Sequence, residues 1–214
     1  FQEISRVQKS LVRKFDFLLN GITSEEIKIG LKMISSGKFL DDIANNNRGQ
    51  MLQRFVKSKG ELPVIGGKEI NRFVIRANKG FIDRKTVHVD KGQIEKKSLL
   101  AQNIIAHITQ PFDHIKIIAC IPTERHYVIT DTINQLSIFD TNYSQELVWG
   151  LLNSKLVNWY AYRFIFGKAI RTMHFDSPVT SRLPIRNATE AQQSAITILV
   201  GKILAAKKSD TNAD

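Results

Sequence analysis

One segment limits the possible folds more than any other: residues 144–166 carry apolar and aromatic side chains at helical spacing. Ser144 suits the N-cap position, and Glu146 places a negative charge in the first turn. Beyond the cap, apolar and long side chains recur every three or four residues, which predicts one long amphipathic helix. Its packing face comprises Val148, Leu151, Leu152, Lys155, Leu156, Trp159, Tyr160 and Arg163. Periodicity alone would equally fit an ordinary core helix, so this segment indicates part of the fold but no function.

Four short segments before this helix are rich in β-branched and aromatic residues and are separated by turn signals. They cover residues 103–109, 114–121, 126–132 and 135–139. Such spacing is typical of an antiparallel meander. The sequence therefore predicts an α+β fold in which a mainly antiparallel β-sheet packs against the long amphipathic helix.

Further helices are expected at both ends of the chain. Residues 1–19 predict one helix, which Asn20–Gly21 would end. A second helix would start at a cap on Thr23 or Ser24 and run to about Ser35. The last helix would follow a cap at Thr189, with Ile196, Leu199, Val200, Ile203 and Leu204 facing inward.

These elements suggest three parts. Because the chain opens on Phe1 instead of Met, we expect it to be a piece of a longer protein. Residues 1–36 would form a helical connector to a missing catalytic domain, and residues 37–206 a folded domain. The polar residues 207–214 would form a disordered tail.

Charge is unevenly distributed along the chain. It holds 31 Lys plus Arg against 20 Asp plus Glu, a net charge of +11. Residues 48–97 contain 13 basic and 5 acidic side chains, and residues 163–186 contain 5 and 1. The 98–162 segment between them contains only 3 basic and 5 acidic side chains. Two basic segments around a near-neutral frame predict an anionic partner, with nucleic acid as the first candidate.

Cysteine content and hydropathy exclude other classes. A single cysteine, Cys120, lies in an apolar run, which indicates a reducing compartment and an inert buried thiol. No apolar run is long enough to cross a bilayer, and no signal peptide is apparent. We therefore expect a cytoplasmic protein that does not bind membranes. No Cys/His cluster has zinc spacing, so no metal site is predicted.

Polar side chains in the two basic segments could contact base edges. Asn, Arg and Gln have donors and acceptors that match bases in the major groove. The segment Asn45–Gln50 would be a loop of this kind, although an Asn/Gly loop is often only a turn. Residues 167–180 form a second polar, basic connection. The base-contacting candidates are Asn46, Arg48, Gln50, Lys168, Arg171 and Thr172.

Other cations in the first basic segment are candidates for phosphate contact. Residues 72–76 predict a strand with Arg72 and Arg76 on one face, and residues 81–89 add cations on strand-like sequence. Cations on a sheet face suit phosphate binding. These candidates are Arg54, Arg72, Arg76, Lys79, Arg84 and Lys85.

Two alternative functions fit parts of the sequence. Asp83 or Asp90 followed by Glu95 and Lys97 could hold magnesium and activate water in a nuclease, but charged loops often produce this spacing by chance. An RNA-binding module would stack single-stranded bases on aromatic rings. The aromatic candidates fall mostly on the predicted helix, where core packing is their expected use: Trp149, Trp159, Tyr160 and Phe164. No catalytic residues are predicted.

The order of motifs along the chain resembles a known family. GKFLDDI, the Asn/Arg/Gln segment, ELPVIGGKEINRFVI, the β segments, LLNSKLVNWY and LPIRNATEAQQSAI follow one another over residues 37–205. This order resembles the target-recognition domain of TaqI-like N(6)-adenine DNA methyltransferases, which is their C-terminal specificity domain. The same domain occurs in type IIG restriction-modification enzymes, and relatives form type I specificity subunits. The most specific signals are Leu151-Leu152-Asn153-Ser154-Lys155, and Leu183-Pro184-Ile185 with Gln192 or Gln193 and Ile196 behind it; Arg186 stands where relatives often carry a second proline.

The resemblance implies recognition of a specific sequence in double-stranded DNA. The catalytic tetrapeptide of such enzymes, Asn/Asp-Pro-Pro-Tyr/Phe, and their Gly-rich cofactor loop are missing from this sequence. We therefore expect this fragment to bind no cofactor and to place an adenine for a methyltransferase catalytic domain of the same chain. S-adenosylmethionine, and magnesium if the parent also cleaves as a restriction endonuclease, would belong to that longer protein.

Overall fold

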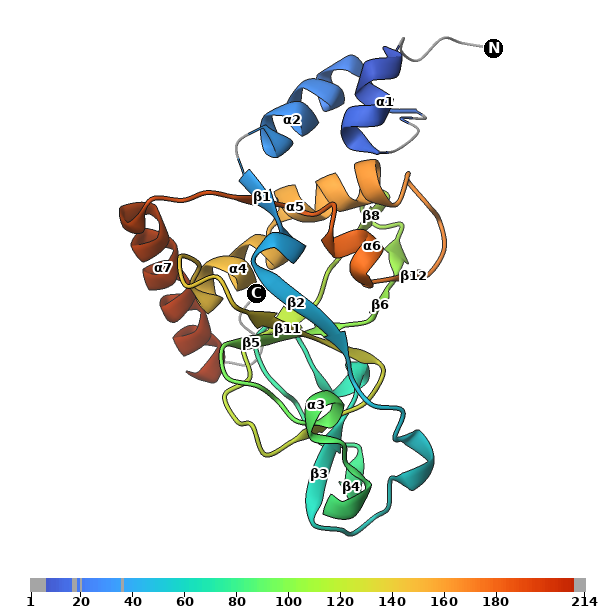
Figure 1. Cartoon of the computed structure of the whole chain (residues 1–214), viewed down its shortest axis with the longest axis vertical. Helices are drawn as coiled ribbons and strands as arrows, with labels where there is room; N and C mark the ends of the chain where they lie inside the picture. Colours follow the sequence, from blue (N-terminus) through green and yellow to red (C-terminus); the bar gives the residue numbers. More distant parts are fainter. Residues whose placement is uncertain (1–6, 17–18, 20, 36, 210–214) are drawn as a thin grey trace.

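A four-stranded antiparallel sheet lies at the centre of the molecule (Figure 1). Its order is β2 (Ala44–Arg48), β11 (Ile133–Ile138), β5 (Ser98–Gln102) and β9 (Ala119–Cys120). All of β11 is buried, and its Leu136 pairs with Asn46 of β2 and Leu99 of β5. The computed structural model describes residues 7–16, 19, 21–35 and 37–209. These residues confirm the predicted α+β class, with helices beside several antiparallel strand pairs.

Neighbouring strands of the central sheet come from distant parts of the chain, unlike those of the predicted meander. The edge strand β2 is formed by the segment that was predicted to be a loop. Its residues pair with β11 from Arg48 opposite Asn134 to Ala44 opposite Ile138. Asparagine favours turns, but pairing along a whole strand outweighs that local preference. A contact between segments so far apart in sequence cannot be predicted from the segment itself.

The predicted long helix is divided at Ser154. The first part, α4 (Gln145–Asn153), starts at the predicted cap, where Ser144 Oγ accepts a hydrogen bond from Leu147 N at 3.1 Å. Ser154 is extended, with ψ of 148°, and therefore ends α4. Its hydroxyl oxygen accepts a hydrogen bond from Val157 N at 3.2 Å and so caps the next helix.

The second part consists of α5 (Lys155–Tyr160) and a π-helical turn, η5 (Ala161–Ile165). The break at Ser154 shifts the helical register, so Leu156 of the predicted packing face is 52% exposed. Tyr160, by contrast, is buried and stacks on Phe164 with ring centroids 5.0 Å apart.

Below the central sheet in Figure 1 lies a smaller lobe with its own sheet. Strand β3 (Leu62–Ile65) pairs antiparallel with β4 (Gly80–Ile82) and parallel with β10 (Val128–Ile129). An apolar cluster of Leu52, Val64, Ile82 and Val128 stabilises it. Short helical turns lie within this part of the chain: η2 (Gln53–Phe55), η3 (Gly67–Glu69), η4 (Arg84–Thr86) and α3 (Val89–Gly92).

Residues 72–76 do not form the predicted strand. Asn71 N donates a hydrogen bond to Val74 O at 2.9 Å, which closes a turn, and only an isolated bridge joins Ile70 to Ile75. Arg72 is consequently half-buried whereas Arg76 is exposed, so the two side chains do not share a strand face.

Three two-stranded pairs complete the sheets. They are β1 (Gly37–Phe39) with β13 (Pro184–Arg186), β6 (Ile104–Ile105) with β12 (Met173–His174), and β7 (His107–Ile108) with β8 (His114–Ile115). Leu183, Pro184 and Ile185 of the predicted family motif are all buried where the first pair forms. Two short turns, η1 (Leu40–Asp42) and α6 (Ser177–Thr180), follow β1 and β12.

The described part of the N-terminal arm packs on the main core. Helix α1 (Lys9–Phe15) ends at Asp16, which has a left-handed conformation (φ 48°), and so ends earlier than predicted; residues 1–6 lie outside the described residues. Helix α2 (Ser24–Ile34) starts at Thr23 with a capping box to Glu26, which confirms the predicted cap. Phe15 stacks on Phe164 of the main domain with centroids 4.8 Å apart.

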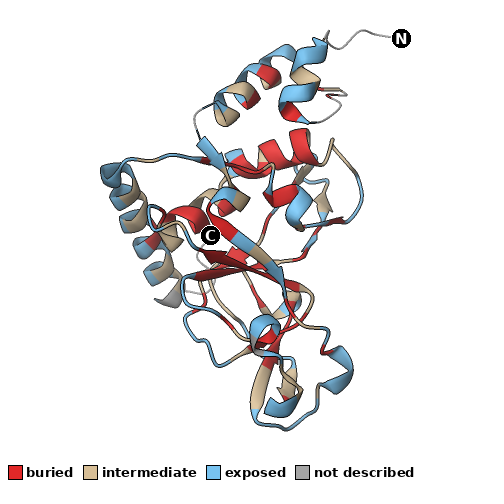
Figure 2. Cartoon of the chain, viewed as in Figure 1, coloured by how far each residue is buried: buried red, intermediate tan, exposed pale blue. Residues whose placement is uncertain are grey.

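The C-terminal helix α7 (Glu190–Ser209) and the β6–β12 pair lie on opposite sides of the molecule (Figure 1). Thr189 Oγ1 accepts a hydrogen bond from Gln192 N at 3.3 Å, as the predicted cap requires. Ile196, Val200 and Leu204 pack on the core, but Leu199 and Ile203 are exposed, so the predicted inward face was too wide (Figure 2). The helix continues past residue 207, where the tail was predicted to begin; residues 210–214 lie outside the described part. None of the described helices has the length and hydropathy required to span a membrane.

Candidate nucleic-acid interface

Parts of the two basic segments lie on the same side of the molecule. In Figure 1 the small lobe with β3 and β4 extends to the lower right, and the connection that leads into β12 lies to the upper right. Residues 72–73 of the first segment instead pack against α4 and α7. Helix α7 lies on the other side. Cations from both segments can therefore face one extended anionic partner.

Four of the predicted phosphate contacts are exposed cations, and three of them, Arg54, Arg84 and Lys85, lie on the turns η2 and η4 of the small lobe. The side chains of Arg76, Arg84 and Lys85 make no hydrogen bond or ion pair within the described residues. The Arg54 guanidinium lies over the Phe55 ring, 4.7 Å from its centroid, and remains exposed. A fifth candidate, Lys79, is exposed and donates a hydrogen bond to the side chain of Gln53.

The sixth phosphate candidate, Arg72, is used inside the protein. Its Nε donates a hydrogen bond to Asn153 Oδ1 at 3.0 Å, and a terminal nitrogen donates to Asn153 O at 2.5 Å. Burial lowers the pKa of this guanidinium. A cation at the last residue of α4 satisfies a free carbonyl and interacts favourably with the helix dipole. Arg72 therefore stabilises the helix break and is not available to a partner in this conformation.

Two base-contacting candidates on or after β2 are also engaged internally. Asn46 Nδ2 donates hydrogen bonds to Phe175 O at 3.0 Å and to Thr180 Oγ1 at 3.5 Å. Gln50 Nε2 donates to Thr86 O at 3.0 Å, and its Oε1 accepts from His88 N at 2.8 Å. Gln50 thus holds the segment that carries Arg84 and Lys85 against the end of β2.

Arg48 lies at the end of β2 with an exposed side chain. Its Nε donates a hydrogen bond to Asp131 O at 2.7 Å, and a terminal nitrogen lies 3.8 Å from Asp131 Oδ2. The side chain is 49% exposed, so part of the guanidinium remains accessible to a partner.

The predicted contacts of the second basic segment differ in their surroundings: Lys168 is bonded to the N-terminal arm, whereas Arg171 and Thr172 lie at the exposed tip of the connection. Lys168 has φ of 58°, and its ammonium donates a hydrogen bond to Gly21 O in the N-terminal arm. Arg171 and Thr172 are exposed and make no side-chain hydrogen bond or ion pair within the part of the chain that the structure describes. Ile170 beside them is 79% exposed. Only the tip of this connection presents side chains outward.

A buried network of amides lies behind this tip. Asn103 Nδ2 donates hydrogen bonds to Asn134 Oδ1 at 2.7 Å and to Asp176 Oδ1 at 2.9 Å. Asn134 Nδ2 donates to Asn46 Oδ1 and to Phe175 O, each at 2.8 Å. Asn103 and Asn134 are buried, with exposed fractions of 0% and 2%. The network joins β2, β11, the start of β6 and the β12–α6 connection, and so fixes the end of the second basic segment.

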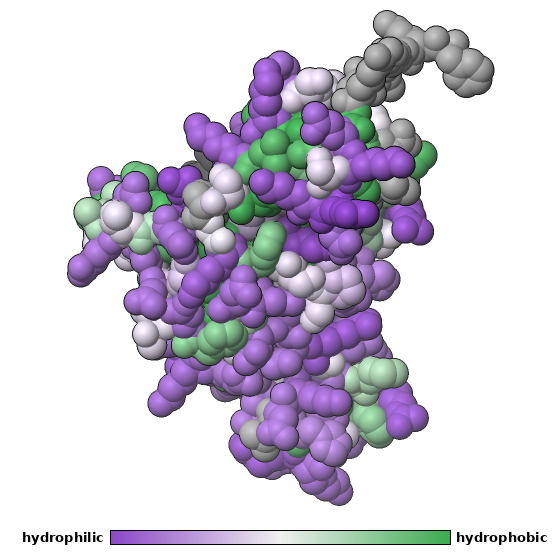
Figure 3. Space-filling view, turned by 45° about the horizontal axis from the view of Figure 1, so that its top comes forward, coloured by the Kyte–Doolittle hydropathy of each residue, from purple (hydrophilic) through white to green (hydrophobic). Residues whose placement is uncertain are grey.

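Three further features of this side were not predicted from the sequence. His174 of β12 is exposed and bonded to Asn103. Met51 and Phe55 are the exposed large apolar side chains among described residues 48–97, with exposed fractions of 77% and 38%. Figure 3 shows a small apolar patch at the edge of the otherwise mostly hydrophilic lower lobe. Only the Met51–Phe55 spacing around Arg54 could have been recognised in the sequence; the position of His174 depends on strand pairing.

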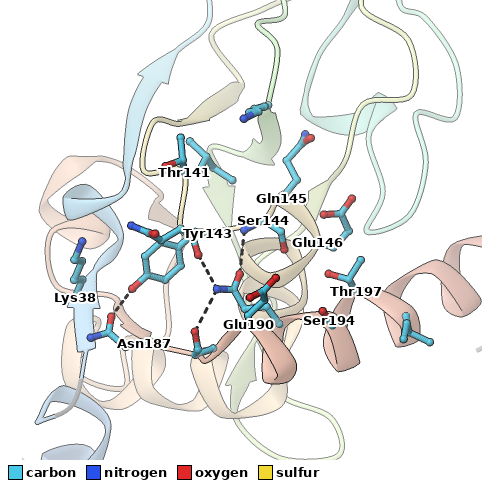
Figure 4. Close-up of a pocket in the computed structure, with 16 residues that line it drawn as sticks. Lys38, Thr141, Tyr143, Ser144, Gln145, Glu146, Asn187, Glu190, Ser194 and Thr197 are labelled. Atoms are coloured by element: carbon cyan, nitrogen blue, oxygen red, sulfur yellow. Dashed lines mark hydrogen bonds between the residues drawn. The ribbon is translucent and has the colours of Figure 1, made fainter.

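A polar cavity lies elsewhere, between the start of α7 and the loop before α4. It has a volume of about 1130 Å³ and is lined by polar side chains, among them Lys38, Tyr143, Asn187 and Glu190. Figure 4 shows Tyr143 pointing at Asn187, to which its hydroxyl donates a hydrogen bond. Gln193 of α7 bonds to the loop before α4: its Nε2 donates to Asn142 O at 2.6 Å, and its Oε1 accepts from Ser144 N at 3.3 Å. These bonds dock α7 on the domain.

Metal and thiol chemistry gain no support from the described residues. No three His, Cys, Asp or Glu side chains among them gather into a group that could hold a metal ion. Asp83 of the nuclease hypothesis pairs with Lys57 at 2.8 Å. Cys120 is buried, as predicted, and burial raises the pKa of its thiol to about 12, which suppresses the reactive thiolate.

Fold and surface together define an α+β domain that presents cations from two chain segments on one side. The family model of the TaqI-like C-terminal specificity domain matches residues 62–185, which is more than half of the chain. The chain belongs to this family and is a DNA sequence-recognition domain of the restriction-modification type. Among curated proteins, no sequence matches it.

Solved structures with a similar fold include specificity subunits. One is the S subunit of a type I restriction-modification system from M. genitalium, with TM-score 0.46 and 14% identity over 94% of this chain and 49% of that chain. Another is the HsdS subunit from Thermoanaerobacter tengcongensis, with TM-score 0.40 and 11% identity over 96% and 49%. A third structure, from work on the complex assembly of a type I restriction-modification system, gives TM-score 0.45 and 10% identity, and the match covers 80% of this chain and 40% of that chain. This chain spans less than half the length of each.

Proposed function

We propose that this chain recognises a specific sequence in double-stranded DNA for a restriction-modification adenine methyltransferase. A catalytic domain in the same polypeptide would bind S-adenosylmethionine and methylate the adenine, with magnesium needed only if the parent also cleaves. The chain described here would hold the duplex so that the target adenine can leave the stack and enter that catalytic domain.

One observation carries the proposal: exposed cations without ion pairs occur in the small lobe and at the tip of the second basic segment, on the same side in Figure 1. Arg84, Lys85 and Arg171 make no ion pair within the described residues, so an anionic partner can neutralise them. Phosphates spaced along a duplex would supply that neutralisation at both segments at once.

The structure narrows the candidate contacts. Arg54, Arg76, Lys79, Arg84 and Lys85 remain candidates for phosphate binding, because their side chains are exposed. Arg48, Arg171 and Thr172 remain candidates for base contacts. The other four candidates form hydrogen bonds within the protein, which favours a role in holding the fold: Asn46, Gln50, Arg72 and Lys168.

Selection from a random duplex library tests the proposal. The purified chain should enrich one short sequence, and the enriched duplex should bind at least about 10³-fold more tightly than a scrambled duplex at physiological salt. Single-stranded RNA and single-stranded DNA serve as competitors in the same assay. Equal binding of enriched and scrambled duplexes, or stronger competition by single-stranded RNA, would overturn the proposal.

A further inference from the structure

The β6–β12 pair presents two unlike side chains next to each other on its outer face. His174 of β12 pairs with Ile104 of β6, whereas the neighbouring pair, Met173 and Ile105, is buried. Since side chains alternate between the faces of a strand, His174 and Ile104 share the outward face. His174 is exposed and Ile104 is 40% exposed. His174 follows the Arg171–Thr172 tip closely in the chain, and strand pairing places Ile104 beside His174.

The buried amide network determines which nitrogen of His174 carries hydrogen. Phe175 O and the Asp176 carboxylate can only accept hydrogen bonds. Asn134 must therefore direct its NH₂ group at Phe175 O, and Asn103 must direct its own at Asp176. The oxygen of Asn103 then faces the His174 ring, with Nδ1 at 2.8 Å. Because an amide oxygen is an acceptor, His174 Nδ1 must donate.

This arrangement leaves Nε2 of a neutral His174 ring as an acceptor. The two ring nitrogens point in widely different directions, so Nε2 is directed away from buried Asn103. It makes no hydrogen bond within the described residues. An acceptor held at a fixed angle beside an apolar side chain is suited to an adenine–thymine pair in the major groove. Adenine presents its N6 amine as a donor there, and thymine presents its methyl group.

We propose that His174 and Ile104 together recognise one A·T base pair, with His174 Nε2 accepting from adenine N6 and Ile104 contacting the thymine methyl. This inference rests on the proposed function, and it adds a specificity-determining pair on a two-stranded ribbon. A ribbon of this kind fits the width of the major groove. Asn103 acts as a positioning residue, because it orients the histidine ring without facing the DNA.

The variant His174→Asn separates recognition from structure. An asparagine amide can still donate to Asn103 Oδ1, but it lacks a group at the position of Nε2. We expect an unchanged melting temperature, unchanged affinity for a scrambled duplex, and a loss of 5-fold or more in discrimination at one A·T pair of the enriched duplex. Asn103→Leu should reduce both discrimination and melting temperature, since it also removes buried hydrogen bonds.

Modified bases identify the contacted atoms. Replacing that adenine with purine, which lacks the N6 amine, should weaken binding of the parent and leave binding of His174→Asn unchanged. Replacing the paired thymine with deoxyuridine should weaken binding of the parent and leave Ile104→Ala unchanged. If His174→Asn keeps full discrimination at every A·T pair while the parent still selects a sequence, this inference fails and the proposed function stands. If the parent selects no sequence, the proposed function itself fails.

The tautomer can be tested without DNA. In a long-range ¹H–¹⁵N spectrum of the neutral ring, His174 should show a protonated Nδ1 and an unprotonated Nε2. The signals of His174 are identified among those of the five histidines because they disappear in the His174→Asn variant. A signal pattern with the proton on Nε2 would contradict the proposed acceptor.

Discussion

Two arginines illustrate how residue type and role differ in this domain. Arg72 and Arg171 lie in the two basic segments, and both are candidates for DNA contact by sequence. The structure places Arg72 against Asn153 at the end of α4, whereas Arg171 is exposed without a side-chain partner among the described residues. Both cations can be recognised in the sequence, but the contact between Arg72 and the distant end of α4 cannot.

Arg171→Ala should reduce discrimination at one base pair. If the guanidinium makes a bidentate contact with a guanine edge, its loss costs about 1–3 kcal/mol of discrimination at that pair. Lys202→Ala on α7 is the control, because Lys202 is an exposed cation on the other side. Binding to the enriched duplex and its single-pair substitutions measures the effect. Identical behaviour of Arg171→Ala and the parent on all duplexes would exclude this assignment.

Asn153→Ala should destabilise the fold. Asn153 Nδ2 donates hydrogen bonds to Ala119 O at 3.1 Å and Trp149 O at 2.9 Å, while its Oδ1 accepts from Arg72. Removing this side chain leaves a half-buried guanidinium without one acceptor, so we expect a loss of about 2–3 kcal/mol in the free energy of unfolding.

Chemical denaturation measures that loss, with Asn142→Ala as the control. Within the described residues the Asn142 side chain bonds only to Asp140 of the same loop, so its removal should change stability by less than about 0.5 kcal/mol. Equal stability of the two variants would contradict a structural role for the Asn153–Arg72 contact.

Among the elements, helix starts were predictable and strand partners were not. Ser144, Thr23 and Thr189 each cap the helix predicted to follow, because a cap depends on three or four adjacent residues. Strand β2 depends on pairing with β11 and was predicted as a loop. The break at Ser154 likewise involves distant residues, because Asn153 bonds to Arg72 and to Ala119 of β9. The apolar spacing continues across Ser154, so periodicity predicted one unbroken helix.

The N-terminal arm gives an element-scale prediction through Gly30. A Cβ at this position of α2 would lie 2.7 Å from Phe164 Cζ, and the Phe164 ring is stacked between Phe15 and Tyr160. Gly30→Ala should therefore destabilise the protein by about 1–3 kcal/mol, although alanine normally favours a helix.

Gly201→Ala in α7 is the matched control. No heavy atom lies within 4 Å of a Cβ built there, so helix propensity should dominate and raise stability by about 0.5–1 kcal/mol. Thermal unfolding of both variants measures whether each substitution lowers or raises the stability of the fold. Stabilisation by both substitutions would show that α2 does not pack on Phe164 in solution.

For the whole molecule, the uneven distribution of charge was the most informative sequence feature. The small lobe of the first basic segment and the connection into β12 lie on one side in Figure 1, although the two segments are separated by more than sixty residues of near-neutral sequence. Which cations remain exposed could not be predicted, because internal partners such as Asn153 for Arg72 and Gly21 for Lys168 come from distant segments.

Salt dependence tests this charge distribution. In the triple variant Arg54→Ala, Arg76→Ala, Arg84→Ala, the slope of log K against log salt concentration should decrease by about 0.9 for each side chain that contacts a phosphate. The control, Lys9→Ala, Lys32→Ala, Lys202→Ala, removes the same charge from exposed positions on α1, α2 and α7. Equal slopes for the two triple variants would mean that the small lobe does not contact the backbone of the duplex.

The anchored connection between η5 and β12 has a practical consequence. Lys168 bonds one end of the connection to the N-terminal arm, and the bond between His174 and Asn103 holds the other end. Ile170, Arg171 and Thr172 are exposed between these two contacts, so they can be replaced without removing either contact. A library randomised at these three codons should yield mostly folded proteins, and its members offer a starting point for enzymes retargeted to new sites.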